Sequence, residues 1–233
     1  MKNIGVMFST FDGDAKHFDR FIAELERLAF PFAAHLDHCC AETKKRFAMH
    51  PLCVGVHMDD DPESHWDESF RQSALSILQE REFKWALSLD TDETLERKAP
   101  EKIVEATKLG ADIVDFRVLD LWGDGRHYRK DGPFEESHRE KLFNLRAGDI
   151  AYYHPTIHAP KVKPHGREVV VAKYYPIYVL HWGIMDMDDV RLHTARFDAI
   201  YNRKVGGNPY TFYKDINDPA TVPIIKEVPE ELL

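Results

Sequence analysis

The sequence is poor in cysteine and has no long apolar run. Only three of its 233 residues are cysteines, namely the adjacent pair Cys39 and Cys40 and the separate Cys53. An odd count with an adjacent pair argues against a disulfide framework, and the lack of a CxxC pair disfavours a thiolate zinc site. No apolar run approaches the ~18 residues of a membrane span, and the first residues lack the apolar region of a signal peptide. We therefore expect a cytoplasmic protein without a transmembrane segment.

Basic charge is also scarce. The chain has 31 lysines and arginines against 40 acidic residues, a net charge of -9. This balance disfavours a general nucleic-acid binder. With 43% hydrophobic residues the chain can bury one sizeable core, and it contains no internal repeat. These features predict a single domain over residues 1–233.

The most informative stretch runs from Lys84 to Glu93. Its apolar front half predicts a buried strand, after which Asp90, Asp92 and Glu93 place three carboxylates within four residues. Solvated turns also collect acidic residues because these bond their own backbone. A bound divalent cation, however, relieves the repulsion of three clustered carboxylates. Such oxygen ligands favour Mg²⁺, Mn²⁺ or Ca²⁺.

The first 93 residues alternate strands and helices. Strands are predicted at 3–8, 32–36, 52–57 and 84–89, with helices over 18–28 and 64–80. Each strand ends in a polar loop, which is typical of a parallel sheet with a ligand crevice along one edge. After Glu93 the pattern changes to a short helix over 100–109 and strands near 112–121, 141–145, 150–153, 169–174 and 177–180. A last helix is expected over 186–204, followed by a tail that wraps the surface.

At this point the sequence resembles the GT-A-fold glycosyltransferases of family 2. The resemblance covers about residues 3–183 and is strongest from Trp66 to Leu95, where a helix with Arg71 precedes the strand and the Leu-Asp-Thr-Asp-Glu segment. It implies an α/β fold, GT-A-like (Rossmann-like), with a mixed sheet, helices on both faces and an antiparallel, loop-rich C-terminal half. Residues 1–95 would bind the nucleotide sugar, 96–205 would bind the acceptor and complete the metal site, and 206–233 would form the tail.

The resemblance also implies a donor site. Ser9, Thr10 and Asp12 would border the nucleoside, Asp37 would pair with the base, and Arg71 would face the diphosphate or the base. Asp90, Thr91 and Asp92 would meet the ribose and a Mn²⁺ or Mg²⁺ cofactor, with Asp90 and Asp92 as metal ligands. The implied activity is transfer of a sugar, with inversion, from a nucleoside-diphosphate sugar, preferably a UDP-sugar, to an acceptor hydroxyl.

Two later segments extend the resemblance. His181, in His181-Trp182-Gly183, stands where a family histidine completes the metal shell, and Arg139 to Asn144 is similar to the family's R-x-RLF strand, with Lys141 replacing the second arginine. The glutamate that serves the family as base is replaced by Ala159, so that His158, Glu136 and Asp186 are the candidate bases. The identity of the acceptor, whether saccharide, lipid, protein or nucleic-acid base, is left open, and no obligate protein partner is evident.

Two other functions fit part of the sequence. The segment from Leu89 to Leu95 also fits the DxDx[TV] pattern of haloacid-dehalogenase-like phosphatases, with Asp90 as the nucleophile and Asp92 as the acid/base. That motif normally lies at the start of its domain, whereas here it follows the fourth predicted strand. The loss of the family glutamate at Ala159 would equally suit a binding module that holds a cation or ligand without turnover.

Overall fold

The structure, a computed structural model, describes residues 3–60, 68–131, 134–151, 161–163, 167–183, 185, 188, 191, 195 and 224–233. Its N-terminal part alternates strands and helices, as predicted. The elements are β1 (Ile4–Thr10), the 3-10 helix η1 (Asp12–His17), α1 (Phe18–Leu28), β2 (Phe32–Asp37), α2 (Ala41–Ala48), β3 (Cys53–Asp59), α3 (Glu68–Glu80) and β4 (Trp85–Ser88). Helix α2 was not expected, because it buries only Thr43 and Phe47 and so carries too short an apolar stripe to stand out in the sequence.

The second part is built mainly of strands. Its elements are β5 (Glu93–Leu95), α4 (Ala99–Ala106), β6 (Ile113–Trp122), β7 (His127–Arg129), β8 (His138–Asn144), β9 (Asp149–Ala151), β10 (Lys161–Lys163), β11 (Val171–His181), β12 (Ile225–Glu227) and the 3-10 helix η3 (Glu230–Leu232). The strands expected at 169–174 and 177–180 form one strand, β11, whose register to β6 shifts on both sides of Tyr175. The helix predicted over 186–204 lies largely outside the described residues.

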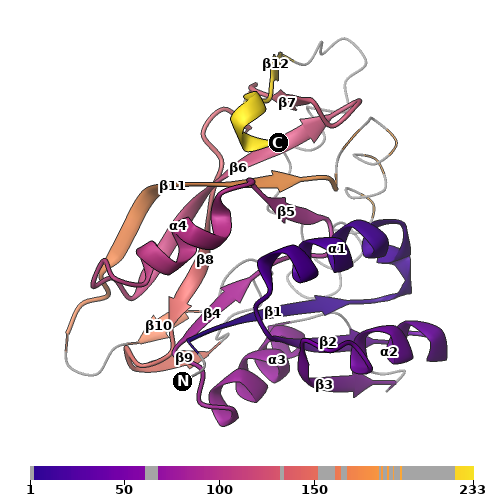
Figure 1. Ribbon diagram of the computed structural model, residues 1–233, viewed down its shortest axis with the longest axis vertical. Coiled ribbons are helices and arrows are strands. Elements are labelled where there is room, and N and C mark those ends of the chain that lie inside the picture. The colour runs from indigo at the N-terminus through magenta and orange to yellow at the C-terminus, as the bar shows by residue number, and fades with distance from the viewer. Residues whose placement is uncertain are drawn as a thin grey trace.

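One ten-stranded sheet runs through the molecule (Figure 1). Along it the strands follow the order β12-β7-β6-β8-β4-β1-β2-β3, and β11 joins β5 to β6. Strands β4, β1, β2 and β3 are parallel to one another, whereas β8 is antiparallel to both β4 and β6. The second half is therefore largely antiparallel, as expected, except that β11 runs parallel to β6.

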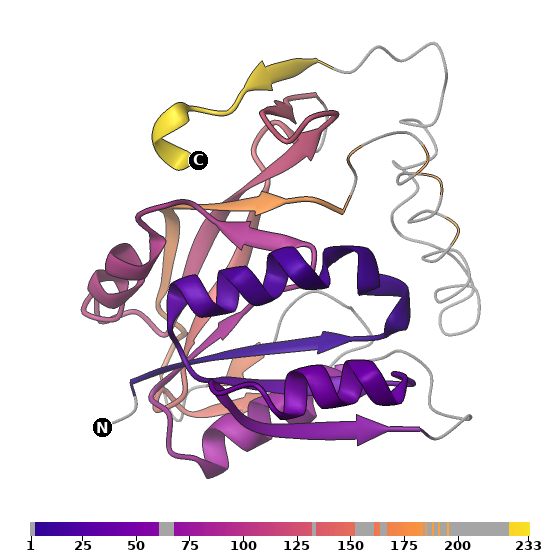
Figure 2. The same cartoon turned by 45° about the vertical axis from the view of Figure 1, so that its right-hand side comes forward.

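Helices cover both faces of this sheet, which agrees with the predicted fold class. Helices α1, α2 and α4 pack on one face through Phe21, Phe47 and Ile103, and α3 packs on the other through Leu75 and Leu78. The four buried apolar residues of α1, namely Phe18, Phe21, Leu25 and Leu28, recur every three or four positions, the spacing that places them on one side of a helix. In Figure 2 the C-terminal segment lies at the opposite end of the molecule from α3.

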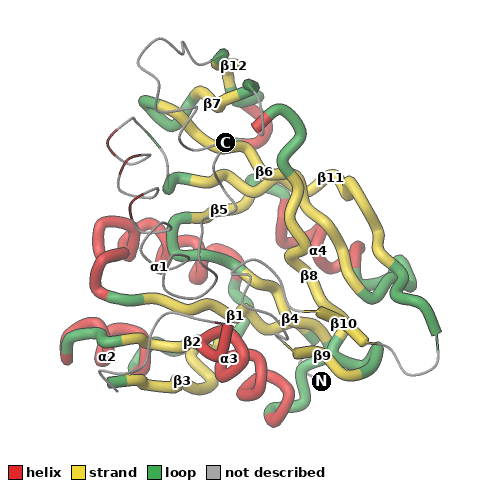
Figure 3. Tube along the Cα trace, turned by 180° about the vertical axis from the view of Figure 1, so that it is seen from behind, coloured by secondary structure: helices red, strands yellow, loops and turns green. Residues whose placement is uncertain are grey.

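The rear view in Figure 3 shows the small β9–β10 pair beside β4. No described helix is both long enough and apolar enough to cross a lipid bilayer. Because β1, β2 and β4 are parallel neighbours, their carboxyl ends meet at one edge of the sheet. Apart from Arg71 on α3, the residues predicted for the donor site lie at or shortly after these three ends.

Candidate functional site

The Asp90–Glu93 segment forms a closed turn between β4 and β5. The Glu93 amide donates to the Asp90 carbonyl oxygen at 3.0 Å, and the Asp90 amide donates to Glu93 Oε2 at 2.9 Å. The Glu93 side chain is fully buried, while Asp90 and Asp92 remain partly exposed. The third carboxylate therefore stabilises the turn from inside and leaves Asp90 and Asp92 partly exposed at the edge of the sheet.

Three positively charged side chains contact this turn. Lys141 Nζ lies 2.5 Å from Glu93 Oε2 and 3.9 Å from Asp90 Oδ2, and Arg139 Nη1 lies 3.1 Å from Glu93 Oε1. Arg71, on α3, forms an ion pair with Asp90. Burial by itself raises the pKa of Asp90, but the charges of Arg71 and then Lys141 outweigh it and lower this pKa to about 2. Asp90 is therefore ionised across the physiological range.

His181 lies between two carboxylates. Its Nδ1 donates to Asp120 Oδ1 at 2.6 Å, and its Nε2 lies 3.4 Å from Asp92 Oδ2. Burial alone lowers the pKa of the imidazole, but the charge of Asp92 and the hydrogen bond to Asp120 raise it to about 10. The same bond lowers the pKa of Asp120, against the effect of burial. Two strand pairings produce this arrangement, because β11 places His181 opposite Glu93 of β5 and opposite Asp120 of β6.

The chain closes around this histidine at Gly183. A Cβ atom at Gly183 would lie 2.2 Å from Asp92 Oδ2 and 2.8 Å from His181 Nε2, so only glycine leaves space beside these two atoms. The Trp182 amide donates to the Asp92 carbonyl oxygen at 2.7 Å and holds the two segments together. We call Asp92, His181 and Gly183 the metal cradle.

The metal cradle has the donor set of a cation site. Asp92 Oδ2 and His181 Nε2 are near enough to contact one ion, and both belong to ligand types that Mn²⁺ accepts. The bond from Nδ1 to Asp120 orients the ring so that Nε2 faces the cradle. Most metal-binding histidines donate their other ring N–H in this way, to a carboxylate, a backbone carbonyl or a water. The residues present therefore fit a divalent cation, which on binding must displace the Nε2 proton that the raised pKa of His181 implies.

The residues predicted to border the nucleoside lie at the neighbouring strand ends. Ser9 and Thr10 are buried at the end of β1. Asp12 begins η1 and accepts hydrogen bonds from the Cys40 amide and from Thr43 Oγ1, both at 2.9 Å. Asp12 thus ties the loop after β1 to the start of α2.

Asp37, at the end of β2, belongs to a second group of possible metal ligands. Ligand atoms of His35, Asp37 and Asp59 all lie within 4.8 Å of one another, so that this group could hold a metal ion. Asp37 Oδ1 also pairs with His38 Nδ1 at 2.5 Å, and His35 Nδ1 bonds to Ser73 Oγ at 2.8 Å. Sequence reasoning named Asp37 here but missed its two partners.

The three candidate bases are placed less completely. Glu136 is exposed and lines a separate cavity of about 170 Å³ with Arg117 and Tyr178. Among the described residues, no hydrogen bond or ion pair joins Glu136 to the metal cradle. His158 and Asp186 lie outside the described residues.

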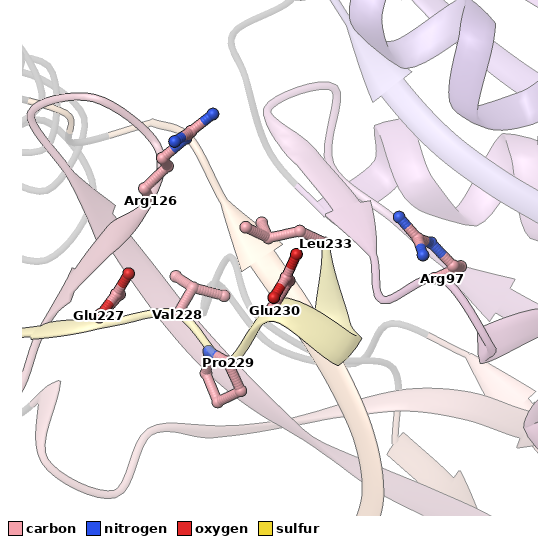
Figure 4. A pocket seen from close by; sticks show the side chains of 7 residues that line it. All are labelled: Arg97, Arg126, Glu227, Val228, Pro229, Glu230 and Leu233. Carbon is pink, nitrogen blue, oxygen red and sulfur yellow. The ribbon is translucent and has the colours of Figure 1, made fainter.

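A larger hollow of about 700 Å³ lies beside the C-terminal segment (Figure 4). Its lining residues are Arg97, Arg126, Glu227, Val228, Pro229, Glu230 and Leu233. The two arginines stand on opposite sides of Glu230 and Leu233. The hollow shares no residue with the metal cradle or with the predicted donor site.

Sequence reasoning also missed the buried ion pair of Glu93 and the role of Asp120, whereas it had assigned Gly183 to a close approach of the backbone to a ligand. The signal for Asp120 was present, because a lone carboxylate between Leu119 and Leu121 in an apolar strand needs a buried partner. Nothing local in the sequence indicated that this partner would be His181.

No protein-family model matches this sequence, and a search of curated proteins finds no relative. Solved structures do match its fold. TarS of S. aureus, residues 1–349, matches with a TM-score of 0.51 and 10% identity over 91% of this chain and 68% of that fragment. The structure of the same fragment with UDP matches with a TM-score of 0.51 and 11% identity over 91% of this chain and 68% of the fragment. The structure with UDP-GlcNAc matches with a TM-score of 0.50 and 11% identity over 84% of this chain and 66% of the fragment. The chain thus spans about two thirds of that fragment, and the GT-A-like fold predicted from the sequence is confirmed.

Proposed function

We propose that this protein is a metal-dependent glycosyltransferase that moves a sugar from a nucleoside-diphosphate sugar to an acceptor hydroxyl. The observation that carries the proposal is the metal cradle, built beside the Asp90–Glu93 turn at the carboxyl edge of a GT-A-like sheet. A UDP-sugar is the favoured donor, and UDP-GlcNAc is the first to test because TarS was solved with it.

Asp92 and His181 would hold a Mn²⁺ or Mg²⁺, with Asp90 beside them. The cation would supply Lewis-acid stabilisation of the negative charge on the leaving diphosphate. The remaining tasks belong to the chain. Asp120 keeps the imidazole ring of His181 oriented, and the Glu93 turn holds Asp90 and Asp92 at the crevice. Such preorganisation lets the ligands meet the substrate without rearrangement.

The donor's nucleoside would lie over the ends of β1 and β2. Ser9, Thr10 and Asp12 border that place, Asp37 accepts a hydrogen bond from the base, and Arg71 supports Asp90. In the reaction the acceptor oxygen bonds to the anomeric carbon from the opposite side as the bond to the diphosphate breaks, which inverts the centre. The proton of the acceptor passes to a base, for which His158, Asp186 and Glu136 are the candidates.

Asp92 and His181 are the preferred metal ligands over the His35, Asp37 and Asp59 group. Asp37 Oδ1 is already paired with His38 Nδ1, and Asp37 is assigned to the nucleobase. In the metal cradle, by contrast, the Nδ1 bond to Asp120 turns Nε2 toward Asp92. The two sites make different predictions for single substitutions.

Calorimetric titration of UDP and UDP-GlcNAc, each with and without Mn²⁺, tests the proposal. We expect wild type to bind both only with Mn²⁺, and Asp92→Asn and His181→Gln to lose most of this binding. His35→Gln serves as the control, and it should retain metal-dependent binding. If His35→Gln abolishes Mn²⁺ binding while Asp92→Asn keeps it, the metal belongs to the other group and the proposed site is wrong.

The two alternative functions predict different results in binding and turnover measurements. A haloacid-dehalogenase-like phosphatase would be stabilised by beryllium fluoride through Asp90 and would not need a nucleotide. The ion pair of Asp90 with Arg71 and the GT-A-like fold both disfavour that reaction. A binding module would bind the nucleotide sugar but release no UDP with any acceptor, nor by slow hydrolysis.

A further inference from the structure

Strand β8 brings two cations, Arg139 and Lys141, to the Asp90–Glu93 turn. Side chains two residues apart on a strand share one face, and both of these contact the same carboxylate, that of Glu93. The sheet order explains the contact, because β8 lies between β4, which leads into the turn, and β6, which carries Asp120. From these positions we infer that Arg139 binds the leaving diphosphate of the donor, an inference that rests on the proposed function.

The two cations differ in how far they reach solvent. Only 3% of the Lys141 side chain is exposed, and its ammonium group contacts Glu93 at 2.5 Å and faces Asp90 at 3.9 Å. For Arg139 the exposed fraction is 25%, and one Nη contacts Glu93 at 3.1 Å. Lys141 is therefore enclosed as a structural counter-ion, whereas Arg139 is held by Glu93 and remains partly exposed to solvent.

The chemistry of the guanidinium group suits this place. It presents several N–H donors in a planar fork, and this fork matches phosphate oxygens in a bidentate way that a lysine ammonium does not reproduce. Holding one edge of the fork on Glu93 restricts its rotation, so less entropy is lost when a phosphate binds the exposed part. Arg139 is thus a preorganised anion-binding group at the sheet edge.

Arg139 is also linked to the metal cradle through one buried residue. Its Nη1 contacts Glu93 Oε1 at 3.1 Å, and Glu93 lies opposite His181 in the pairing of β5 with β11. The guanidinium therefore lies beside the turn that carries Asp92. A diphosphate bound to a cation in this cradle would be close to it.

Arg71 is the competing arginine, and sequence reasoning assigned the diphosphate or the base to it. In the structure Arg71 forms an ion pair with Asp90, and only 11% of its side chain is exposed. Its main contribution is to keep Asp90 ionised and in place. Arg139 has the greater exposure, and its contact is to a buried carboxylate that no ligand can reach.

The test is calorimetry of UDP, UMP and uridine with Mn²⁺, on wild type, Arg139→Met, Arg139→Lys and the control Arg146→Met. Arg146 is an exposed arginine in the turn that follows the same strand. Losing a charged hydrogen-bond partner costs about 1.5–3 kcal/mol, so Arg139→Met should weaken UDP binding about ten- to hundredfold. Uridine affinity should stay within about twofold, and Arg146→Met should match wild type.

Arg139→Lys keeps the charge without the fork and retains a partner for Glu93, so it remains informative if Arg139→Met folds poorly. We expect it to bind UDP at an affinity between those of wild type and Arg139→Met, with uridine unaffected. UDP affinity within threefold of wild type in Arg139→Met would overturn the inference. An equal loss of UDP and uridine binding would also overturn it, since the residue would then act through structure. Failure of wild type to bind UDP with Mn²⁺ would instead refute the proposed function.

Discussion

The ion pair of Glu93 and Lys141 offers a quantitative test of the structure. Glu93 is 0% exposed and Lys141 3%, and their charged atoms lie 2.5 Å apart. Removing one partner of a buried pair leaves the other charge without compensation and costs about 3–5 kcal/mol. In Glu93→Gln, Asp90 remains 3.9 Å from Lys141 as a weaker partner. We therefore expect a loss near the lower limit, about 3 kcal/mol, from a total stability of roughly 5–15 kcal/mol.

Urea denaturation at pH 7 without metal, followed by tryptophan fluorescence and circular dichroism, measures this loss. The double variant Glu93→Gln/Lys141→Met removes both charges, so it should lose less than the sum of the single variants, with a coupling energy of about 1–3 kcal/mol. Glu105→Gln is the matched control, because Glu105 pairs with Lys108 at 2.7 Å but both side chains are 63% exposed. It should change stability by less than about 0.5 kcal/mol.

Two results would refute this reasoning. A loss below about 1 kcal/mol in Glu93→Gln would mean that the carboxylate is not ionised and buried in the folded protein. Additive losses in the double variant would mean that Glu93 and Lys141 do not interact, and the position of β8 beside the turn would then be wrong.

Three further outcomes are expected. The pKa of Asp112 is lowered first by hydrogen bonds from Arg167, so the pair of Asp112 and Arg167 stabilises the fold at pH values above the unfolded-state pKa of about 3.9. This contribution is lost as the pH falls through the lower folded-state pKa. When the free energy of unfolding is measured against pH, Asp112→Asn should therefore show a smaller decrease at acid pH than wild type. Gly183→Ala fills the metal cradle, so calorimetry should show Mn²⁺ binding that is weakened at least about tenfold, with an unchanged circular dichroism spectrum. Wild-type affinity for Mn²⁺ in this variant would contradict the cradle geometry. Burial, with nearby carboxylates, raises the pKa of Cys39 to about 12. Iodoacetamide labelling at pH 8, followed by mass spectrometry, should therefore modify the exposed Cys40 at least about a hundredfold faster than Cys39. Equal rates would show that Cys39 is not enclosed.

The strands and helices of the first half could be predicted because their signals are local. The apolar run before Asp90 and the spacing of the α1 core residues each lie within one element, and each determines that element's exposed and buried sides. The order of strands and helices then places the acidic loops at one edge of a parallel sheet, so the position of the Asp90–Asp92 turn at that edge could be predicted from the sequence. Helix α2 was not predicted, because its two buried residues are too few to form a periodic pattern.

The sequence by itself determined the alternating scaffold and the position of the Asp90–Asp92 turn. Only the tertiary structure decided which side chains complete the site. Glu93 meets Lys141 across 48 residues, and His181 meets Asp120 across 61. These contacts depend on the insertion of β8 between β4 and β6 and on the parallel pairing of β11 with β6. The physical reason is that a strand's local pattern sets which face is buried, whereas its neighbours in the sheet are chosen by packing between segments far apart in the chain.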